Sequence, residues 1–218
     1  MGGDLIQRNT IHRCDCMEGM AQMPDNYIDL AIVDPPYGIG MPVIEAGKWK
    51  REIHNKEKRW DDMPPSKEYF IELRRISTNR IIWGANYFIE YLESTPCVVW
   101  WDKNNGNNFM ADGELAWLSF NSGARRFVYS HIQEYNAGKH RIHPTQKPVD
   151  LYKWLLTNYA KEGDLILDTH MGSGSSYIAC LDMGFDYIGY EIDADYFAAI
   201  EDRVYHFTRQ TTLALDAT

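Results

Sequence analysis

The sequence lacks the features that mark membrane-spanning, exported or disulfide-stapled proteins. It has no uninterrupted apolar run of about 18 residues, and its first residues lack the basic segment and apolar stretch of a secretory signal. The cysteines form no C-x-x-C pair, and no second pair completes a zinc site with the first two; they are Cys14, Cys16, Cys97 and Cys180. We therefore expect a cytoplasmic protein with reduced cysteines, no bound metal and no membrane partner.

The sequence also lacks internal repeats, low-complexity tracts and a linker rich in proline and serine. A chain of 218 residues with 44% apolar residues is long enough to bury one sizeable core. We therefore predict a single domain over residues 1–218, with residues 211–218 as a frayed tail.

Basic residues are outnumbered, and their distribution is uneven. The net charge of -9 argues against a polyanionic partner, because phosphate contacts are made mainly by Lys and Arg. Two segments depart from this balance, since residues 38–80 carry a net charge of +3 and residues 121–147 one of +4. Taken alone, both segments are also consistent with ordinary solvated surface.

Short apolar, β-branched runs alternate with helix-period segments, which is typical of a parallel sheet with helices on both faces. Apolar positions at spacings of three and four predict one helix after Pro148 and another around Ile200. Residues 38–65 and 121–147 are longer than ordinary loops, and such loops are generally functional or disordered. Seven strands are predicted, at Thr10–Cys14, Ile28–Val33, Arg80–Trp83, Cys97–Trp101, Leu115–Phe120, Leu165–Leu167 and Tyr187–Tyr190.

An acidic residue directly follows four of these strands. They are Asp15, Asp34, Asp168 and Glu191. Ligands of open α/β sheets bind outside the carboxyl ends of the strands, so we expect the four carboxylates to converge on one crevice.

A glycine-containing turn, Gly172-Ser173-Gly174, follows Asp168 and leads into a predicted helix. Glycine lets the backbone approach a ligand closely. A nicotinamide dinucleotide is one candidate ligand, but its fingerprint needs Gly or Ala where Tyr177 stands. S-adenosylmethionine (SAM) fits the surrounding carboxylates better, because it has ribose hydroxyls and a sulfonium but no phosphate. Glu191 is placed either to accept hydrogen bonds from a ribose or to cap a helix.

The segment Asp34-Pro35-Pro36-Tyr37 combines rigidity with hydrogen-bond acceptors. Its two prolines fix the backbone and remove two N–H donors while leaving their carbonyl groups free. An exocyclic amine such as N6 of adenine could give one hydrogen to the Asp34 carboxylate and the other to the Pro35 carbonyl, which would aim its lone pair at a methyl sulfonium. Tyr37 could stack on a base flipped out of a duplex. Taken alone, the segment could also be an ordinary turn at the end of a strand.

Together these motifs resemble the circularly permuted, beta-type family of bacterial and phage DNA amino-methyltransferases. The resemblance covers almost the whole chain and implies a Rossmann-like α/β methyltransferase fold with a seven-stranded mixed sheet. Thr169, His170 and Ser175 depart from the family pattern and resemble phage and prophage members. The matching segments are Cys14-Asp15-Cys16, Asp25–Leu30, Asp34–Tyr37, Trp83–Asn86, Trp101–Lys103, His143–Pro148, Leu167-Asp168, Gly172–Gly174 and Ile188–Asp193.

The resemblance implies a role for each matched position. Asp34, Pro35, Pro36 and Tyr37 would form the reaction site. Lys147 would pair with the methionine carboxylate of the cofactor. His170 would either replace an aromatic wall of the cofactor pocket or be structural. The residues expected to bind SAM are Asp15, Cys16, Asp34, His143, Thr145, Lys147, Asp168, His170, Gly172, Ser173, Gly174, Ser175, Glu191 and Ile192.

The basic segments would then face DNA, with residues 38–65 and 121–147 as the DNA-facing loops. Because little of the chain is left for a separate recognition segment, the resemblance implies a short recognition site or a homodimer that shares the work. The residues expected to contact DNA are Lys103, Arg125, Arg126, Lys139 and Arg141, with His140 beside them.

The function expected from the sequence is site-specific methylation of adenine N6 in DNA, as part of a restriction-modification system. An aspartate at the position of Asp34 favours adenine in similar enzymes, where serine is usual for cytosine N4. Three alternatives stay open: the same chemistry on cytosine N4 or RNA, a non-catalytic subunit that binds cofactor and nucleic acid, and a nicotinamide-dependent oxidoreductase.

Overall fold

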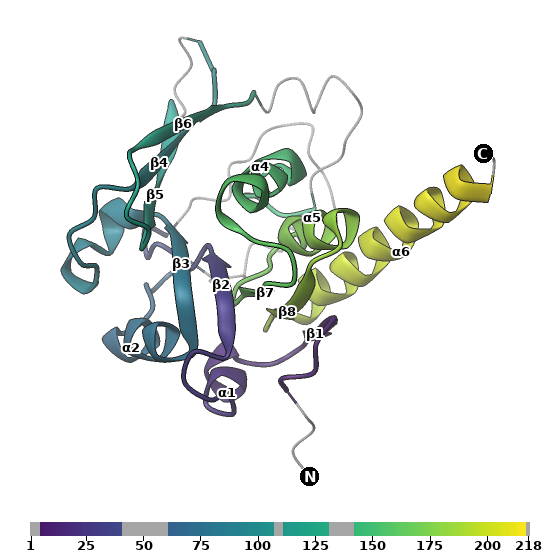
Figure 1. Ribbon diagram of the computed structural model, residues 1–218, viewed down its shortest axis with the longest axis horizontal. Helices are drawn as coiled ribbons and strands as arrows, with labels where there is room; N and C mark the ends of the chain where they lie inside the picture. The colour runs from purple at the N-terminus through teal and green to yellow at the C-terminus, as the bar shows by residue number, and fades with distance from the viewer. Residues whose placement is uncertain (1–4, 41–60, 107–110, 131–141, 217–218) are drawn as a thin grey trace.

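The fold is built on one mixed β-sheet (Figure 1). The computed structural model describes residues 5–40, 61–106, 111–130 and 142–216. The strand order across the sheet is β1-β8-β7-β2-β3-β5-β4-β6. The strands are β1 (Thr10–His12), β2 (Ile28–Val33), β3 (Ser77–Trp83), β4 (Val98–Asp102), β5 (Gly113–Leu118), β6 (Arg125–Val128), β7 (Leu165–Asp168) and β8 (Asp186–Tyr190).

Helices cover both faces of the sheet, as the sequence predicts. They are α1 (Cys16–Met20), α2 (Lys67–Ile76), α4 (Val149–Tyr159), α5 (Ser175–Met183) and α6 (Ala194–Asp216), with the short 3-10 helices η1 (Ala85–Tyr87) and η2 (Ile89–Tyr91). All strand pairs are parallel except those that β5 makes with β3 and β4. The sheet is therefore mixed, as expected.

Alternate residues of each central strand enter two separate cores. In β2, Leu30 and Ile32 pack with Leu151 and Leu155 of α4, while Val33 packs on the opposite face against α1 and α2. Because both faces are covered, β2 is apolar at consecutive positions instead of alternating with polar residues. This central strand carries the Asp34-Pro35-Pro36-Tyr37 segment at its carboxyl end.

Two sequence predictions about chain segments are wrong. The sheet has eight strands instead of seven, because β6 lies within residues 121–147, which we expected to be a loop. This strand has four residues and, within the described part of the chain, pairs with β4 alone at the sheet edge. Its exposed arginines hid the strand pattern. The expected frayed tail is also wrong for residues 211–216, which continue α6; no Gly or Pro interrupts this helix.

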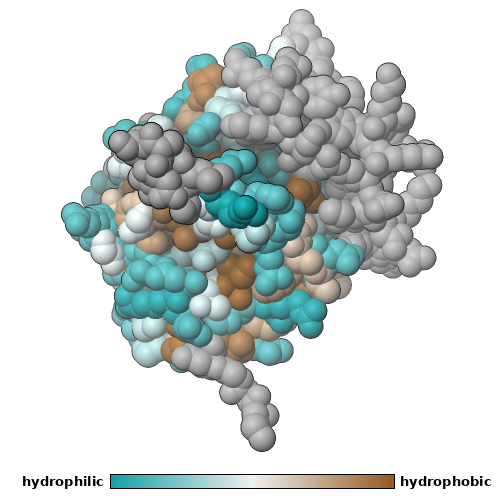
Figure 2. All heavy atoms as spheres, turned by 90° about the vertical axis from the view of Figure 1, so that its right-hand side faces the viewer, coloured by the Kyte–Doolittle hydropathy of each residue, from teal (hydrophilic) through white to brown (hydrophobic). Residues whose placement is uncertain are grey.

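Hydrophilic residues spread over the face that Figure 2 shows, with small groups of hydrophobic residues between them. Within the described part of the chain, none of the helices is long and apolar enough to cross a membrane.

Helix α4 links the core to the site, since it begins directly after the His143–Pro148 segment. Replacing Leu155, which is fully buried in α4, by alanine should lower the free energy of unfolding by about 2–5 kcal/mol through lost burial and the cavity left behind. Denaturant unfolding measures this. Thr157→Ala, on the exposed side of the same helix, should change stability by no more than about 0.5 kcal/mol. Equal effects of the two substitutions would contradict the assigned faces.

Candidate functional site

Four acidic residues gather at the carboxyl edge of the sheet. Strands β1, β8, β7 and β2 are neighbours and run parallel, so their carboxyl ends share one edge. Asp34 directly follows β2, Asp168 ends β7, Glu191 directly follows β8, and Asp15 caps the helix after β1. The charges of Asp34 and Glu191 both contribute to raising the pKa of Asp168. The four carboxylates therefore lie at one edge of the sheet, as predicted.

The Asp34-Pro35-Pro36-Tyr37 turn is held by two carboxylates. The Tyr37 hydroxyl donates a hydrogen bond to Oδ1 of Asp34 at 2.7 Å. From the far side of the turn, Oδ1 of Asp61 accepts the backbone N–H groups of Tyr37 at 2.7 Å and Gly38 at 3.1 Å. Asp61 is 5% exposed, so these contacts satisfy a carboxylate that is almost withdrawn from water. Asp61 therefore supplies the acceptor for the N–H groups that follow the prolines.

The ring of Tyr37 packs into a space that glycine leaves open. It stacks on Tyr87 with ring centroids 4.9 Å apart and planes inclined by 17°. Gly84 lies beside its edge, where an added Cβ would come within 2.2 Å of Tyr37 Cε1. Gly84 also has a φ of 72°, which L side chains rarely adopt. The Trp83-Gly84-Ala85-Asn86 motif thus positions the tyrosine of the Asp34-Pro35-Pro36-Tyr37 turn.

A buried lysine bridges the Asp34-Pro35-Pro36-Tyr37 turn and β5. The Nζ atom of Lys147 lies 2.5 Å from Oδ2 of Asp34 and 2.9 Å from Oε2 of Glu114, and its side chain is only 1% exposed. Lys103 pairs with the other oxygen of Glu114 at 2.6 Å. Two carboxylates and two ammonium groups therefore alternate in one series of ion pairs. We call this series, Asp34, Lys147, Glu114 and Lys103, the charge row.

Burial and ion pairing shift the pKa values of the charge row in opposite directions. Burial alone would raise the pKa of Glu114, but the ammonium groups of Lys147 and Lys103 lower it to about 2. Burial also raises the pKa of Asp34; Glu114 adds to this and Lys147 opposes it. The pKa of Lys147 is raised, because the two carboxylates outweigh the loss of hydration. Lys147 and Glu114 are therefore charged at neutral pH.

Asp168 is more strongly withdrawn from water than Glu191. It is 1% exposed, and burial raises its pKa to about 7 although Ser176 Oγ (2.6 Å) and the backbone N–H of His170 (3.0 Å) donate to it. Near neutral pH it is thus poised between its two protonation states.

Glu191 and the glycine turn form one hydrogen-bonded unit. One Glu191 oxygen accepts the N–H of Gly172 at 2.9 Å, and the other accepts that of Asp193 at the same distance. The ring of His143 faces Gly172, and Thr145 Oγ1 lies 3.1 Å from its Nδ1 atom. The His143–Pro148 segment and the glycine turn are therefore brought together, as the sequence implies.

Two of the residues that depart from the family pattern, Thr169 and His170, form a polar contact with each other. Thr169 Oγ1 lies 2.7 Å from the Tyr69 hydroxyl and 2.9 Å from Nδ1 of His170. The His170 ring meets Tyr69 edge-on at 5.5 Å, and burial lowers the His170 pKa to about 4. His170 is therefore neutral at pH 7 and packs as an aromatic ring against α2.

Several other predicted cofactor residues have structural contacts in the fold. Ser173 and Ser175 are buried and face α6, where Arg203 donates to the Ser173 carbonyl at 2.7 Å and to Ser175 Oγ at 3.0 Å. Asp15 accepts the N–H of Met17 as a helix cap. Ile192 is 70% exposed. Burial keeps the Cys16 thiol protonated by raising its pKa. The described residues contain no cluster of His, Cys, Asp or Glu that could hold a metal ion.

The residues predicted to contact DNA are only partly brought together. Arg125 and Arg126 lie on β6, where Arg125 donates to Asn158 at 2.9 Å and Arg126 pairs with Asp102 at 3.2 Å. Lys103 belongs to the charge row and lies against the ring of Trp101. Lys139, Arg141 and His140 lie outside the described residues.

Sequence reasoning missed Asp61, Glu114 and Tyr69. Asp61 lies 24 residues after Tyr37, in a segment without periodicity that offered no signal. Glu114 begins an apolar strand, and a lone acid at that position could have been noted as an inward-facing charge. Tyr69 belongs to α2, whose amphipathic pattern, with Phe70, Leu73 and Ile76, was detectable.

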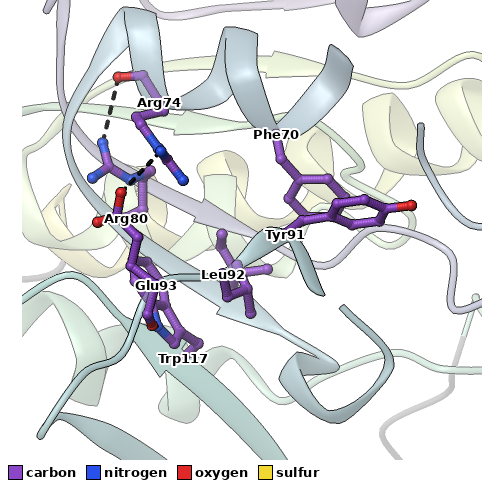
Figure 3. Close-up of a pocket in the computed structure, with 8 residues that line it drawn as sticks. Phe70, Arg74, Arg80, Tyr91, Leu92, Glu93 and Trp117 are labelled. Atoms are coloured by element: carbon purple, nitrogen blue, oxygen red, sulfur yellow. Dashed lines mark hydrogen bonds and ion pairs between the residues drawn. The ribbon is translucent and has the colours of Figure 1, made fainter. Parts of the chain in front are cut away.

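A separate pocket lies between α2, η2 and the strands β3 and β5 (Figure 3). It is lined by Phe70, Arg74, Arg80, Ile82, Tyr91, Leu92, Glu93 and Trp117. Arg74 pairs there with Glu93 at 2.9 Å, and the rings of Phe70 and Tyr91 stack at 5.0 Å. The lining contains none of the acidic residues at the strand ends, so we place the chemistry at Asp34 instead.

The fold and the site define an α/β protein with acidic residues at the carboxyl ends of parallel strands, where open α/β sheets bind their ligands. A family described as DNA methylase, of the N6 and N4 type, matches residues 93–202. The chain therefore belongs to the N6/N4 DNA methylase family.

Relatives agree with this assignment. The chain is 26% identical to the putative methylase YubD of Escherichia coli over 87% of both chains. It is 28% identical to the type II methyltransferase M.HinfI of Haemophilus influenzae, over 90% of this chain and 68% of the relative.

Solved structures share the fold at low sequence identity. M1.HpyAVI in complex with SAM superposes with a TM-score of 0.61 at 18% identity, covering 88% of this chain and 98% of that one. The cytosine-N4-specific PvuII DNA methyltransferase gives a TM-score of 0.56 at 13% identity, covering 88% and 84%. The prediction of an α/β fold with a mixed sheet, as in solved SAM-dependent DNA methylases, is thereby confirmed.

Gly84→Ala should displace Tyr37, because the new methyl group needs the space of its ring and φ stays positive. We expect a loss of about 1–3 kcal/mol in unfolding free energy and a lower methyl-transfer rate. Gly123→Ala is the matched control, since a Cβ there meets nothing within 4 Å. An active Gly84→Ala protein with unchanged stability would contradict the assigned role.

Asp168 should make stability depend on pH. Its folded-state pKa of about 7 exceeds the value of about 3.9 expected in an unfolded chain. Between these values the folded protein binds more protons than the unfolded chain, so stability falls as pH rises and then levels off above about 7. Compared with Asp168→Asn, the wild type should lose about 2–3 kcal/mol more between pH 5 and pH 8 in urea unfolding. Parallel pH curves for both proteins would contradict this.

Proposed function

We propose that the protein is a site-specific DNA methyltransferase that transfers a methyl group from SAM to N6 of a flipped-out adenine. The observation that carries this proposal is the placement of the Asp34-Pro35-Pro36-Tyr37 turn at the same sheet edge as Asp168 and Glu191. One side of the edge offers acceptors for an amine, and the other offers carboxylates for a cationic, hydroxyl-bearing cofactor.

The amine side matches the hydrogen-bonding needs of an exocyclic NH2 group. Each Asp34 oxygen already accepts one hydrogen bond, from Tyr37 or from Lys147, and a carboxylate oxygen can accept two. One further N–H can therefore be accepted, and the Pro35 carbonyl is the acceptor proposed for the other. With both hydrogens held, the nitrogen lone pair points away from the turn toward the methyl donor. An aspartate at this position favours adenine over cytosine.

The cofactor side fits SAM by the chemistry of its donors and acceptors. Glu191 uses one lone pair of each oxygen on backbone N–H groups, which leaves acceptors for ribose hydroxyls. Asp168 is near enough to Asp34 and Glu191 to feel their charges, so a bound sulfonium would find an acidic surrounding. His143 covers Gly172 and would close the methionine end. When bound, SAM supplies an electrophilic methyl group.

The DNA side is proposed from charge and from the relatives. Arg125, Arg126, Lys103, Lys139 and Arg141 are the proposed phosphate and base contacts. M.HinfI and M.BglII of Bacillus subtilis are type II methyltransferases, and we propose a similar restriction-modification role here. A circularly permuted, phage-like subtype and a single domain complete the proposal, with either a short recognition site or a homodimer that shares the work.

Methyl transfer to nucleic acid tests the proposal directly. The purified protein is incubated with labelled SAM and unmethylated DNA or RNA, and the nucleic acid is digested to nucleosides. We expect labelled N6-methyladenine from DNA, and we expect Asp34→Ala to reduce it at least about 100-fold, because the amine loses its charged acceptor. Asp202→Ala, on the exposed side of α6, is the matched control and should keep the wild-type rate.

Other outcomes would replace the proposal. Labelled N4-methylcytosine or methylated RNA would show the same chemistry on a different acceptor. Binding of SAM without transfer to any nucleic acid would favour a non-catalytic subunit. Binding of a nicotinamide dinucleotide but not SAM would overturn the assignment of the cofactor.

A further inference from the structure

The charge row extends the reaction site beyond the Asp34-Pro35-Pro36-Tyr37 turn. We propose that Lys147 and Glu114 are positioning residues for Asp34: Lys147 keeps Asp34 ionised, and Glu114, by sharing the ammonium, leaves Asp34 able to accept a hydrogen from the target amine. This inference rests on the proposed function, because the amine is the group that Asp34 would hold.

The hydrogens of Lys147 are directed into the reaction site. Its Nζ atom is within 2.5 Å of Asp34 Oδ2, 2.9 Å of Glu114 Oε2 and 3.4 Å of the Tyr37 hydroxyl. An ammonium group has three hydrogens, so these three acceptors account for all of them. The ring of Trp83 also lies 5.3 Å from Nζ, and the side chain is 1% exposed. This geometry favours a place beside Asp34 over a pairing with the carboxylate of the cofactor.

Glu114 weakens the hold of Lys147 on Asp34 by competing for the same ammonium. If Lys147 had Asp34 as its only carboxylate partner, a buried one-to-one ion pair would form and Asp34 would be a poorer acceptor for a neutral amine. Lys103 pairs with the far oxygen of Glu114 at 2.6 Å, so the four charges sum to zero. The buried charge is therefore compensated without neutralising Asp34 completely.

Other groups also face Asp34 and must be considered. Tyr37 donates to it from the turn, and Asp168 of β7 lies near enough for mutual repulsion. Tyr152 of α4 and Tyr69 of α2 are uncharged neighbours, since burial raises the pKa of both phenols well above its ordinary value. Lys147 is therefore the nearest cation to Asp34 among the described residues, and Glu114 is the carboxylate that shares it.

The test compares the pH dependence of kcat in three variants at saturating SAM and DNA. Under these conditions the rise of kcat on the acidic side of the pH profile, the acid limb, reports the ionisation of Asp34 in the complex with SAM and DNA. Glu114→Gln leaves the ammonium to Asp34, so the acid limb should move to lower pH and the plateau rate should fall. Lys147→Met leaves Asp34 without a cationic partner, while Glu114 keeps Lys103, so the limb should move to higher pH. Each shift should be about one pH unit or more.

The double variant Lys147→Met/Glu114→Gln removes both the cation and its second partner. Its acid limb should return toward that of the wild type. Such a return would show that misfolding is not the cause of low activity in Lys147→Met. The matched controls carry the same substitutions in ion pairs away from the site: Lys153→Met, which loses its pair with Asp182, and Glu72→Gln, which loses its pair with Arg75. Both controls should keep the wild-type profile. The Kd for SAM should change less than about threefold in all variants.

Specific results would overturn the inference. Acid limbs that stay in place, or that move in the same direction in Glu114→Gln and Lys147→Met, would contradict it. Loss of SAM affinity in Lys147→Met with an unmoved limb would show that Lys147 holds the cofactor carboxylate instead. A wild type that transfers no methyl group refutes the proposed function separately. The inference is then decided by 13C NMR titration of the Asp34 carboxyl carbon in wild type and variants, assigned with Asp34→Asn, where the same opposite shifts are expected.

Discussion

The site depends on a single buried ammonium group shared between two carboxylates. Lys147 lies where three segments that are distant in the sequence meet: the turn after β2, the start of β5 and the segment before α4. A charge withdrawn from water is tolerated only when it is paired and hydrogen-bonded, so the three pieces must reach their places together. Removing one partner leaves an uncompensated charge, which makes this contact specific as well as stabilising. The acidic edge of the sheet and the aromatic packing around Tyr37 are arranged around the ion pair of Lys147 with Asp34.

Much of the fold follows from the sequence pattern, because burial imposes recognisable periods. The strand Ile28–Val33 has the same limits in the sequence prediction and in the structure, since an apolar run between polar residues marks a strand covered on both faces. Strand β6 escaped prediction because an edge strand need not be apolar, and its Arg125 and Arg126 resemble loop residues. The extension of α6 was not predicted, because polar residues beyond the core show no helical periodicity.

The site was predictable where its residues are adjacent in the sequence and hidden where they are not. The turn at Asp34 and the glycine turn at Gly172 are continuous motifs whose residue types reveal their chemistry. The partners that hold them come from distant segments, and no local pattern links Asp61 or Glu114 to Tyr37 and Asp34. The sequence suggested a cofactor carboxylate as the partner of Lys147, whereas the structure places the ammonium against two side chains of the protein itself.

The strand order has a consequence for how the molecule is made. Strand β2 lies between β3 and β7, and its Asp29 accepts the backbone N–H of Leu165 across a separation of 136 residues. A chain emerging from the ribosome therefore presents the turn at Asp34 long before the strand that completes its neighbourhood exists. Contacts so distant in sequence are slow to form, and the exposed side of β2 must wait for β7. The ability to bind and transfer would thus appear only near the end of synthesis, so an incomplete chain would be unable to act on the DNA of its own cell.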